Sequence, residues 1–510
     1  MARALTPARA GLAVGLIAFA GGALTLNHDL VGVFYDDGLY AGLAFALGHG
    51  LGYVHPHLPG TPAAIHYPPL YPLVLAPLFG SLAIETAAFA AKLLNLVLAA
   101  LGAGLVAWYA TRVNLLGDRA PSWLAAALVA ASALAMPVLA VQAVLFAEPL
   151  FGVWLAATMI LAGAPPPRWS STTAAALAGL AAALALLTRS LGVTAAVGVA
   201  LYLAVVRRAA WVDVLAAVAG VAVAAAGWGA WVMRHAGSID PALAMNYGSY
   251  FATVRQAGLG VFRASARDLP RPLADLVLGG LPTPLYYLLG AVALAIGLYG
   301  LARILPRSPI GFTLLCYFAI LALWPFPPDR FLWAVLPWLV LVWAAGALSL
   351  LERPPLRIPV LVLVVTMVAG YGWREVRGFA GRWWGLSASN ISDNFRELLP
   401  WVSTLPPGSV LATDDEALVW LYTHKAAVPL YLYGYRGSTE VRPTPAEHRA
   451  YLERQGVTHI LLAGFGGGSA AELDALLGAY PGWLKIIHRW PGGRTVFQVA
   501  DSIHAGRLKS

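Results

Sequence analysis

Two adjacent carboxylates, Asp36 and Asp37, stand in the stretch FYDDGLYAGLAFALGHGLGY, just past the first apolar segment of the chain. When both members of such a pair are buried, each raises the other's affinity for protons. That tunes one of them towards general-base chemistry near neutral pH. A simpler interpretation is that they open the helix that follows, because acids at a helix N-terminus interact favourably with its dipole. The two interpretations are compatible, since a helix start can present a base rigidly.

Histidines follow in the same loop, at positions 49, 55, 57 and 66. Histidines in one loop could bind a metal or a phosphate, and His55 and His57 have the spacing of two metal ligands, but no cysteine joins them. Histidines that only make hydrogen bonds explain the pattern as well. The sequence therefore leaves open whether a divalent metal binds here, and it indicates no other cofactor.

These residues belong to a chain of 510 residues that is 59% hydrophobic and 11% charged. Soluble domains carry about 25% charged residues, so the composition predicts an integral membrane protein, with membrane lipids around it. The net charge of +9 does not indicate a nucleic-acid partner, because the arginines are scattered between apolar runs, as the positive-inside rule produces. The single cysteine, Cys316, excludes a disulfide framework.

About eleven segments are long and apolar enough to cross a bilayer, which takes about 20 residues each. We interpret the N-terminal one as a retained span. The centres of the predicted spans lie near Phe19, Leu98, Ala131, Ala156, Ala182, Val199, Val221, Val292, Phe318, Trp338 and Val364. Together they predict a transmembrane domain over residues 1–375.

Basic residues mark every second boundary between these spans, which predicts that those boundaries are cytoplasmic. The marked boundaries contain Arg3 and Arg9, Arg112 and Arg119, Arg168, Arg207 and Arg208, Arg303 and Arg307, and Arg353 and Arg357. The N-terminus is then cytoplasmic, and residues 34–80, which have no Lys or Arg, form the first extracytoplasmic loop. The long loop 234–283 is also outside by this alternation, although it carries five arginines. These arginines would meet lipid headgroups or grip an anionic substrate.

Two further features stand apart from the span pattern. Lys92 lies within the second span, where a charge is costly unless it has a partner. After residue 375 the hydropathy drops, and residues 391–502 predict a small soluble α/β domain outside the membrane. SVLAT, THILLAG, LKIIHRW and TVFQVA are its predicted strands, and TPAEHRAYLERQG, with Thr444 as a cap, is a predicted helix.

With these placements the outer loop resembles that of the C-type (GT-C) membrane glycosyltransferases, in the branch of the protein O-mannosyltransferases and the lipid A aminoarabinose transferase. Members carry an acidic pair after the first span, then a tyrosine, a run of Ala and Gly, and a PPL-Y element. Here these are Asp36-Asp37, Tyr40, AGLAFALGHG and the run from Pro68 to Tyr71. FAEPLF with Glu148, LLTRSLG with Arg189 and PPDRFLW with Arg330 are also similar, and each lies at the outer end of a predicted span.

The resemblance implies the GT-C fold and an enzyme that transfers a hexosyl or pentosyl group from a polyprenyl-phosphate donor to a glycan, lipid or protein acceptor. Asp36 matches the catalytic base, and Asp37 would assist it or bind a metal. Arg189 and Arg330 would offset the charge of the departing phosphate, and Glu148 would orient the sugar or pair with an arginine. The expected substrate-binding residues are Tyr40, His66, Tyr67, Tyr71, Lys92, Glu148, Arg189 and Arg330.

One departure from the family pattern bears on the substrate. The aminoarabinose transferase branch has a lysine before the Pro-Pro, whereas His66 and Tyr67 precede it here, which argues against lipid A as the acceptor. Two other function classes stay open: a transporter or flippase for a lipid-linked sugar, and a cell-envelope assembly protein without enzymatic activity. In each case the predicted location is the plasma (inner) membrane of a bacterium, with the C-terminal domain extracytoplasmic.

Overall fold

The computed structural model describes residues 5–250, 255, 283–323, 329–436, 439–463 and 467–500. It is mainly helical, with a small sheet near the C-terminus. Two compact units share the chain: unit 1 contains Met1–Leu26, Lys92–Ala230 and Gly258–Gly385, and unit 2 contains Asn27–Ala91, Trp231–Ala257 and Leu386–Ser510. The predicted first loop, 34–80, therefore belongs to the same unit as the C-terminal domain. Most of the predicted loop 234–283 lies outside the described residues.

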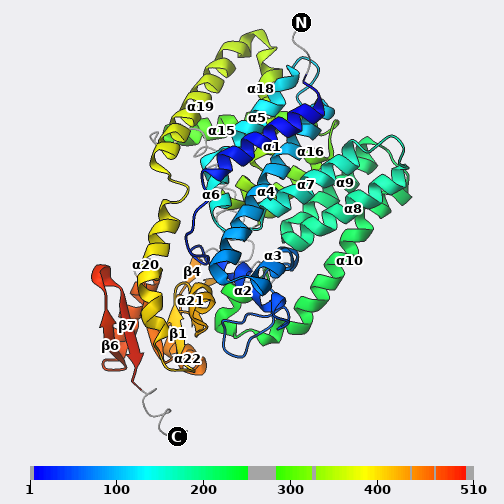
Figure 1. The fold of residues 1–510 in the computed structure, drawn as a ribbon. Helices are drawn as coiled ribbons and strands as arrows, with labels where there is room; N and C mark the ends of the chain where they lie inside the picture. The colour runs from blue at the N-terminus through cyan, green and yellow to red at the C-terminus, as the bar shows by residue number, and fades with distance from the viewer. Residues whose placement is uncertain are drawn as a thin grey trace. The chain divides into compact units, whose positions relative to one another are not determined.

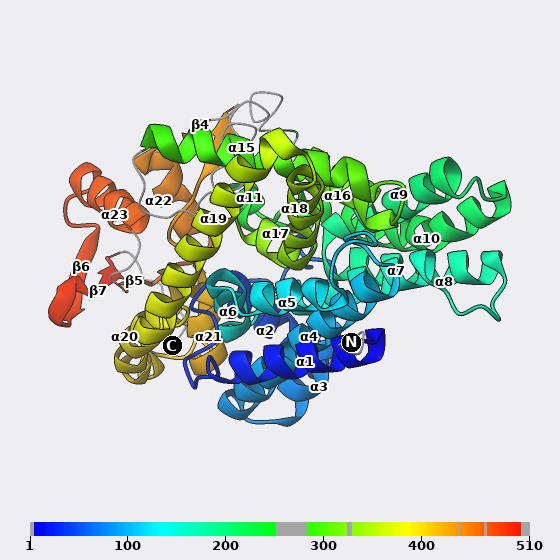
Figure 2. The same ribbon diagram turned by 90° about the horizontal axis from the view of Figure 1, so that it is seen from above.

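Unit 1 is a set of apolar helices. Figures 1 and 2 show α7, α8, α9 and α16 running side by side, and α15 lies along α18. The helices are α1 (Pro7–Ala23), α4 (Ile84–Arg112), α5 (Ser122–Ala133), α6 (Met136–Ala143), α7 (Glu148–Gly163), α8 (Ser171–Thr188), α9 (Val193–Leu201), α10 (Trp211–His235), α15 (Thr283–Ile304), α16 (Pro309–Leu321), α17 (Asp329–Ala334), α18 (Leu336–Leu351) and α19 (Pro354–Gly381). The first residues of α4 and the last of α10 belong to unit 2.

The lengths of these helices are those of a multi-pass membrane protein. Five helices in the described residues are long and apolar enough to span a bilayer, and the bent pair α5–α6 would make a sixth. Six further apolar helices are shorter. All eleven predicted span centres fall inside helices. The number of spans and the sidedness of each loop stay predictions.

The first part of unit 2 consists of α2 (Asp36–Gly48) and α3 (Leu70–Ser81), which pack against each other. They approach most closely at Gly48 and Gly80, where a Cβ on Gly48 would lie 2.6 Å from the carbonyl oxygen of Ala76. Only glycine leaves room for such a crossing. The prolines of this segment predict short helices, because a proline interrupts a helix. Helix α3 is short, with 12 residues, yet Pro77 lies inside it. A helix this short loses few hydrogen bonds to an internal proline.

The C-terminal part of unit 2 is a small α/β domain. Its strands β2, β1 and β5 are parallel, β7 and β6 continue the sheet antiparallel, and the order is β2-β1-β5-β7-β6. The strands of this sheet and its helices are α20 (Leu386–Ser403), β1 (Val410–Thr413), α21 (Glu416–Thr423), β2 (Ala426–Pro429), α22 (Pro445–Arg454), β5 (His459–Leu462), α23 (Gly467–Ala479), β6 (Leu484–Arg489) and β7 (Thr495–Val499). A hairpin of β3 (Gly434–Arg436) and β4 (Thr439–Val441) accompanies them. β1, β5, β6, β7 and α22 lie where the sequence predicts them.

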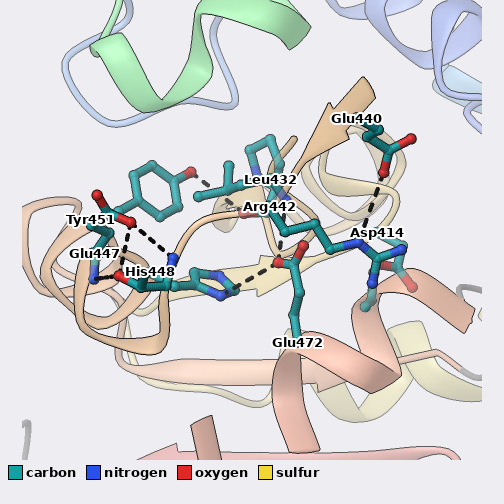
Figure 3. A network of polar contacts seen from close by, with 11 residues as sticks. Asp414, Leu432, Glu440, Arg442, Glu447, His448, Tyr451 and Glu472 are labelled. Carbon is teal, nitrogen blue, oxygen red and sulfur yellow. Dashed lines mark hydrogen bonds and ion pairs between the residues drawn. The ribbon is translucent and has the colours of Figure 1, made fainter. Parts of the chain in front are cut away.

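A polar network ties the helices of this domain to the segment after β2 (Figure 3). The carboxylate of Glu472, on α23, accepts a hydrogen bond from the backbone N–H of Leu432 at 3.3 Å and lies 3.4 Å from Nδ1 of His448, on α22. Burial lowers the pKa of His448 to about 4 and raises that of Glu472 to about 7. Burial thus disfavours the charged form of both side chains. At neutral pH the imidazole is neutral, so this contact is a structural polar contact rather than a strong ion pair.

The start of α22 gives a first prediction. Thr444 and Glu447 form a capping box, in which the Thr444 hydroxyl accepts from the backbone N–H of Glu447 at 3.3 Å and the Glu447 carboxylate accepts from the backbone N–H of Thr444 at 2.8 Å. Replacing a threonine cap by alanine costs about 1 kcal/mol, or roughly fivefold in a local opening equilibrium. We expect Thr444→Ala to speed hydrogen exchange of the α22 amides by about that factor.

Glu453→Gln is the matched control on the same helix. It removes only the exposed pair with Arg449, and such i,i+4 pairs contribute a few tenths of a kcal/mol. Equal exchange in the two variants would contradict the assigned cap.

Candidate functional site

The first helix of residues 34–80 begins at Asp36, on a strained turn. Tyr35, the residue before it, has φ 60° and ψ −71°. The backbone N–H of Asp36 donates to the carbonyl of Phe34 at 2.6 Å, which closes a three-residue γ-turn. A non-glycine residue in such a backbone region costs about 1–3 kcal/mol, and it persists only where its surroundings hold it.

Asp37 supplies part of that support. Its carboxylate accepts hydrogen bonds from the backbone N–H of Gly32 at 2.9 Å and of Phe34 at 3.0 Å, and only 1% of the residue is exposed. Hydrogen bonds to a charged acceptor are stronger than those between neutral groups. Asp37 therefore shapes the turn that carries Asp36.

The Asp36 carboxylate meets a cluster of tyrosines. Tyr67 donates its hydroxyl to Oδ1 of Asp36 at 2.7 Å. Its ring packs on Tyr40, one turn along α2, at 4.8 Å between centroids, and Tyr40 packs edge-on against Tyr71 at 5.0 Å. All three tyrosines are buried. The structure thus gathers Tyr40, Tyr67 and Tyr71 around the predicted base.

His66 makes a different set of contacts. Its Nδ1 lies 2.6 Å from the carbonyl oxygen of Gly248, and its ring lies against those of Tyr67 and Tyr250. His66 therefore links the outer loop to the segment that follows α10. Burial and the nearby Asp36 raise the pKa of the Tyr67 hydroxyl well above its usual value. The hydroxyl therefore stays protonated and can donate its hydrogen bond to Asp36.

A second buried cluster consists of Tyr247, Glu416, His55 and His57. The hydroxyl of Tyr247 donates to Oε1 of Glu416 and lies 2.8 Å from Nε2 of His57, while His55 packs edge-on against the Tyr247 ring at 4.7 Å. Glu416 is the first residue of α21 and is fully buried. Burial raises its pKa to about 8 and lowers that of His57 to about 3. At neutral pH both side chains are therefore mainly neutral.

The histidines thus contact Tyr247 and lie next to each other at 5.5 Å between ring centroids. Within the described part of the chain, no group of three or more His, Cys, Asp and Glu side chains is arranged to hold a metal ion. Of the residues named for a metal, Asp37 accepts two backbone hydrogen bonds, and His55 and His57 lie beside Tyr247. The metal requirement stays an open prediction.

In unit 1, one carboxylate is shared by two arginines. Oε1 of Glu148, the first residue of α7, lies 2.6 Å from Nη1 of Arg189 at the end of α8 and 3.0 Å from Nε of Arg330 on α17. Arg189 also lies over the ring of Phe331, and Arg330 over that of Phe146. The two guanidinium groups thus meet at one carboxylate, and guanidinium groups also bind phosphate oxygens. Such a cluster can receive an anionic group.

Glu148 also lines a cavity of about 70 Å³. Small and apolar residues of α4, α5, α6, α7, α17 and α18 form most of the wall, with Gln142 as a second polar residue. Lys92 is buried in α4. One turn further along this helix, the side chain of Asn95 donates a hydrogen bond to the carbonyl of Phe146 at 2.9 Å. Phe146 stands two positions before Glu148 in the sequence.

The predicted site residues therefore form two groups. Asp36, Asp37, Tyr40, His66, Tyr67 and Tyr71 come together in unit 2, and Glu148, Arg189 and Arg330 come together in unit 1. Sequence analysis missed Tyr247 and Glu416. The signal for Glu416 was there, because three consecutive acids, Asp414, Asp415 and Glu416, follow a predicted strand.

Solved structures with this fold are membrane glycosyltransferases. ArnT, an aminoarabinose transferase from Cupriavidus metallidurans, in the apo state, is 16% identical, with 96% of each chain covered and a TM-score of 0.53. The Archaeoglobus fulgidus oligosaccharyltransferase in the apo form is 14% identical with a TM-score of 0.52, and AglB from the same organism, in complex with an inhibitory peptide and a dolichol-phosphate, is 13% identical with a TM-score of 0.50. Each comparison covers 96% of this chain, and the two archaeal comparisons cover 74% of the other chain.

No protein-family model matches the sequence, and no curated protein matches it. At 13–16% identity the likeness is one of fold. The chain has the GT-C fold, as its sequence motifs predict.

The shared carboxylate gives a second prediction. Removing one partner of a buried ion pair costs about 3–5 kcal/mol, because an uncompensated charge stays buried. We expect Glu148→Gln to lower the thermal stability of the purified protein clearly, as measured by the loss of monodisperse protein after heating. Glu352→Gln, which removes the exposed pair with Arg119 in the same unit, should change it by less than about 1 kcal/mol. Similar losses in both variants would contradict the role assigned to Glu148.

Glu416 gives a prediction about pH. The pKa of Glu416 is about 8 in the folded chain, whereas that of an ordinary exposed glutamate, as in the unfolded chain, is 4.5. Below pH 4.5 the side chain is protonated in both the folded and unfolded chains. As the pH rises from there through 8, the unfolded chain gains stability by ionising this group, and the folded chain loses relative stability. The melting temperature of Glu416→Gln minus that of the wild type should therefore rise over pH 4.5–8 and level off above it. Parallel curves would rule out a buried, proton-binding Glu416.

Proposed function

We propose that this chain, which has the GT-C fold, is a membrane glycosyltransferase that moves a sugar from a polyprenyl-phosphate donor to an acceptor on the extracytoplasmic face. Asp36 is the general base in this proposal. The observation that carries it is the Asp36 carboxylate itself, presented at the start of α2 on a strained turn and held by the hydroxyl of Tyr67. Strained backbone of this kind concentrates at functional sites.

The proposed reaction needs one base. The acceptor hydroxyl attacks the anomeric carbon of the donor sugar, and its proton passes to the Asp36 carboxylate. The new bond joins the acceptor oxygen to the anomeric carbon, while the bond between that carbon and the phosphate oxygen breaks. Attack from the side opposite the phosphate inverts the configuration, and the lipid phosphate leaves with both bonding electrons.

Negative charge grows on the phosphate as it leaves, so the reaction also needs cations. The two arginines Arg189 and Arg330, which meet at the carboxylate of Glu148, support this part of the proposal. Cations already in place where charge develops can contribute about 3–4 kcal/mol to lowering a barrier. Glu148 keeps the two arginines together before the substrate arrives, which limits the reorganisation that binding requires.

The cavity beside Glu148 is small, but its wall is mostly apolar, which supports contact between this region and the isoprenoid part of the donor. A donor of this class is also consistent with the neighbour AglB, whose structure contains a dolichol-phosphate. In the proposal the lipid chain lies along such apolar helices and its phosphate meets the arginines.

The replacement of Asp36 by asparagine tests the function. Asn keeps the size and the acceptor for Tyr67 but cannot take up a proton, so we expect transfer to fall by about 100-fold or more while the protein still folds and inserts. The measurement is a mass-spectrometric comparison of cell glycans and glycolipids from cells with the wild type, the variant or no copy. That comparison reports donor sugar and acceptor together.

Asp118→Asn serves as the matched control, because Asp118 lies in the loop after α4 and bonds to exposed Asn114. It should leave the products unchanged. If Asp36→Asn made the same products as the wild type, Asp36 would not be the base. If no glycan or glycolipid depended on the wild-type chain at all, a transporter or an assembly protein would replace the enzyme.

A further inference from the structure

The segment that carries Asp36 is attached to the C-terminal domain. The backbone N–H of Leu30 donates to the hydroxyl of Ser392 at 2.9 Å, and that of Val31 donates to the hydroxyl of Tyr422 at 3.1 Å. The hydroxyl of Ser389 donates to the Asp29 carboxylate at 2.8 Å. Helices α20 and α21 thus hold residues 29–31 by three hydrogen bonds.

Next to these hydrogen bonds, Gly32 and Gly38 pack so closely against their neighbours that a side chain at either position would not fit. Gly32 has φ +106°, and a Cβ there would lie 2.5 Å from Cβ of Leu418 on α21. A Cβ on Gly38 would lie 2.8 Å from Cα of Gly32 and 3.1 Å from Cβ of Ala417. Helix α21 therefore lies directly against the backbone on both sides of the γ-turn.

The side chain of Tyr35 is buried on the same side. Its ring meets that of Tyr247 edge-on, 6.3 Å between centroids, and the Tyr247 hydroxyl donates to Glu416. Glu416 begins α21, so the helix that touches the turn also carries the carboxyl group that fixes Tyr247. His57, from the outer loop, approaches the same hydroxyl at 2.8 Å.

We propose that the C-terminal domain is a positioning element of the active site, in which Glu416 and α21 hold the Tyr35 turn through Tyr247 and thereby aim the Asp36 carboxylate. The catalytic meaning of this inference rests on the proposed function, whereas its structural part does not. Glu416 is a positioning residue: it acts through Tyr247 and Tyr35 and does not touch the reacting atoms.

The test measures the turn and the transfer reaction separately, on the full chain in lipid nanodiscs. Hydrogen exchange reports the amides of residues 30–34, of which those of Leu30, Val31, Gly32 and Phe34 bond to Ser392, Tyr422 and Asp37. Transfer is followed with a total polyprenyl-phosphate-sugar extract of the expressing cells, in a dilution series that separates kcat from KM. Glu416→Ala should speed exchange of these amides by about tenfold or more and lower kcat by about tenfold or more, with KM for the donor unchanged.

Two variants distinguish positioning from general damage. Glu416→Gln keeps an acceptor for Tyr247 and should behave as the wild type in both measurements. Glu447→Ala removes the matched glutamate in the first turn of α22. It should loosen α22 alone and leave both the turn and kcat unchanged.

If Glu416→Ala also exposes the amides of β1, the domain has unfolded, and Tyr247→Phe takes its place. That variant keeps the ring and deletes only the hydroxyl, and the same changes in exchange and kcat are expected. Unchanged exchange at residues 30–34 with β1 intact would overturn the proposal, and so would faster exchange with a wild-type kcat. Faster exchange in a chain whose wild type transfers no sugar would confirm the hold on the turn and reject the proposed function instead.

Discussion

The carboxylate of Asp37 is the contact on which the rest of the proposed site depends. It gathers two backbone N–H groups, from Gly32 and Phe34, into one buried acceptor, and the positive φ of Tyr35 follows from that arrangement. A buried carboxylate without donors would be costly, so the turn and the charge stabilise each other. The two adjacent acids consequently have different roles. Asp37 shapes the backbone, and Asp36 accepts the hydrogen bond from Tyr67 at the start of α2.

In unit 1, a buried carboxylate is likewise stabilised by the donors around it. Arg189 is buried and Arg330 is partly buried, and the shared carboxylate of Glu148 offsets the repulsion between their charges. Stacking on Phe331 and Phe146 fixes the planes of the two guanidinium groups. One carboxylate thus holds two guanidinium groups in one place.

Much of this arrangement could be predicted from the residues. All eleven span centres predicted from apolar segment length fall inside helices, and strand and cap patterns located most of the C-terminal sheet. The pairing of Glu148 with arginine was one of two roles expected for it. The role of Tyr67 was clear only in part, since the sequence shows that it stands where a related branch has lysine, but not that its hydroxyl reaches Asp36.

The contacts that escaped prediction join segments far apart in the chain. Tyr247 and Glu416 are 169 positions apart, and hydrophobic periodicity indicates which face of a helix is buried but not which partner covers it. Pro77 shows a second limit. A proline lowers the preference for a helix, yet packing of α2 against α3 around Gly48 and Gly80 outweighs that preference.

The attachment of residues 29–31 to α20 and α21 also orders events during synthesis. Val31 and Tyr422 are 391 positions apart, and a ribosome needs on the order of tens of seconds to cover that distance. Until then the first loop has left the ribosome without the helices that complete its turn. A chain that stops before α21 is made would lack the partners of residues 30–32, so the turn that carries Asp36 forms only late in synthesis.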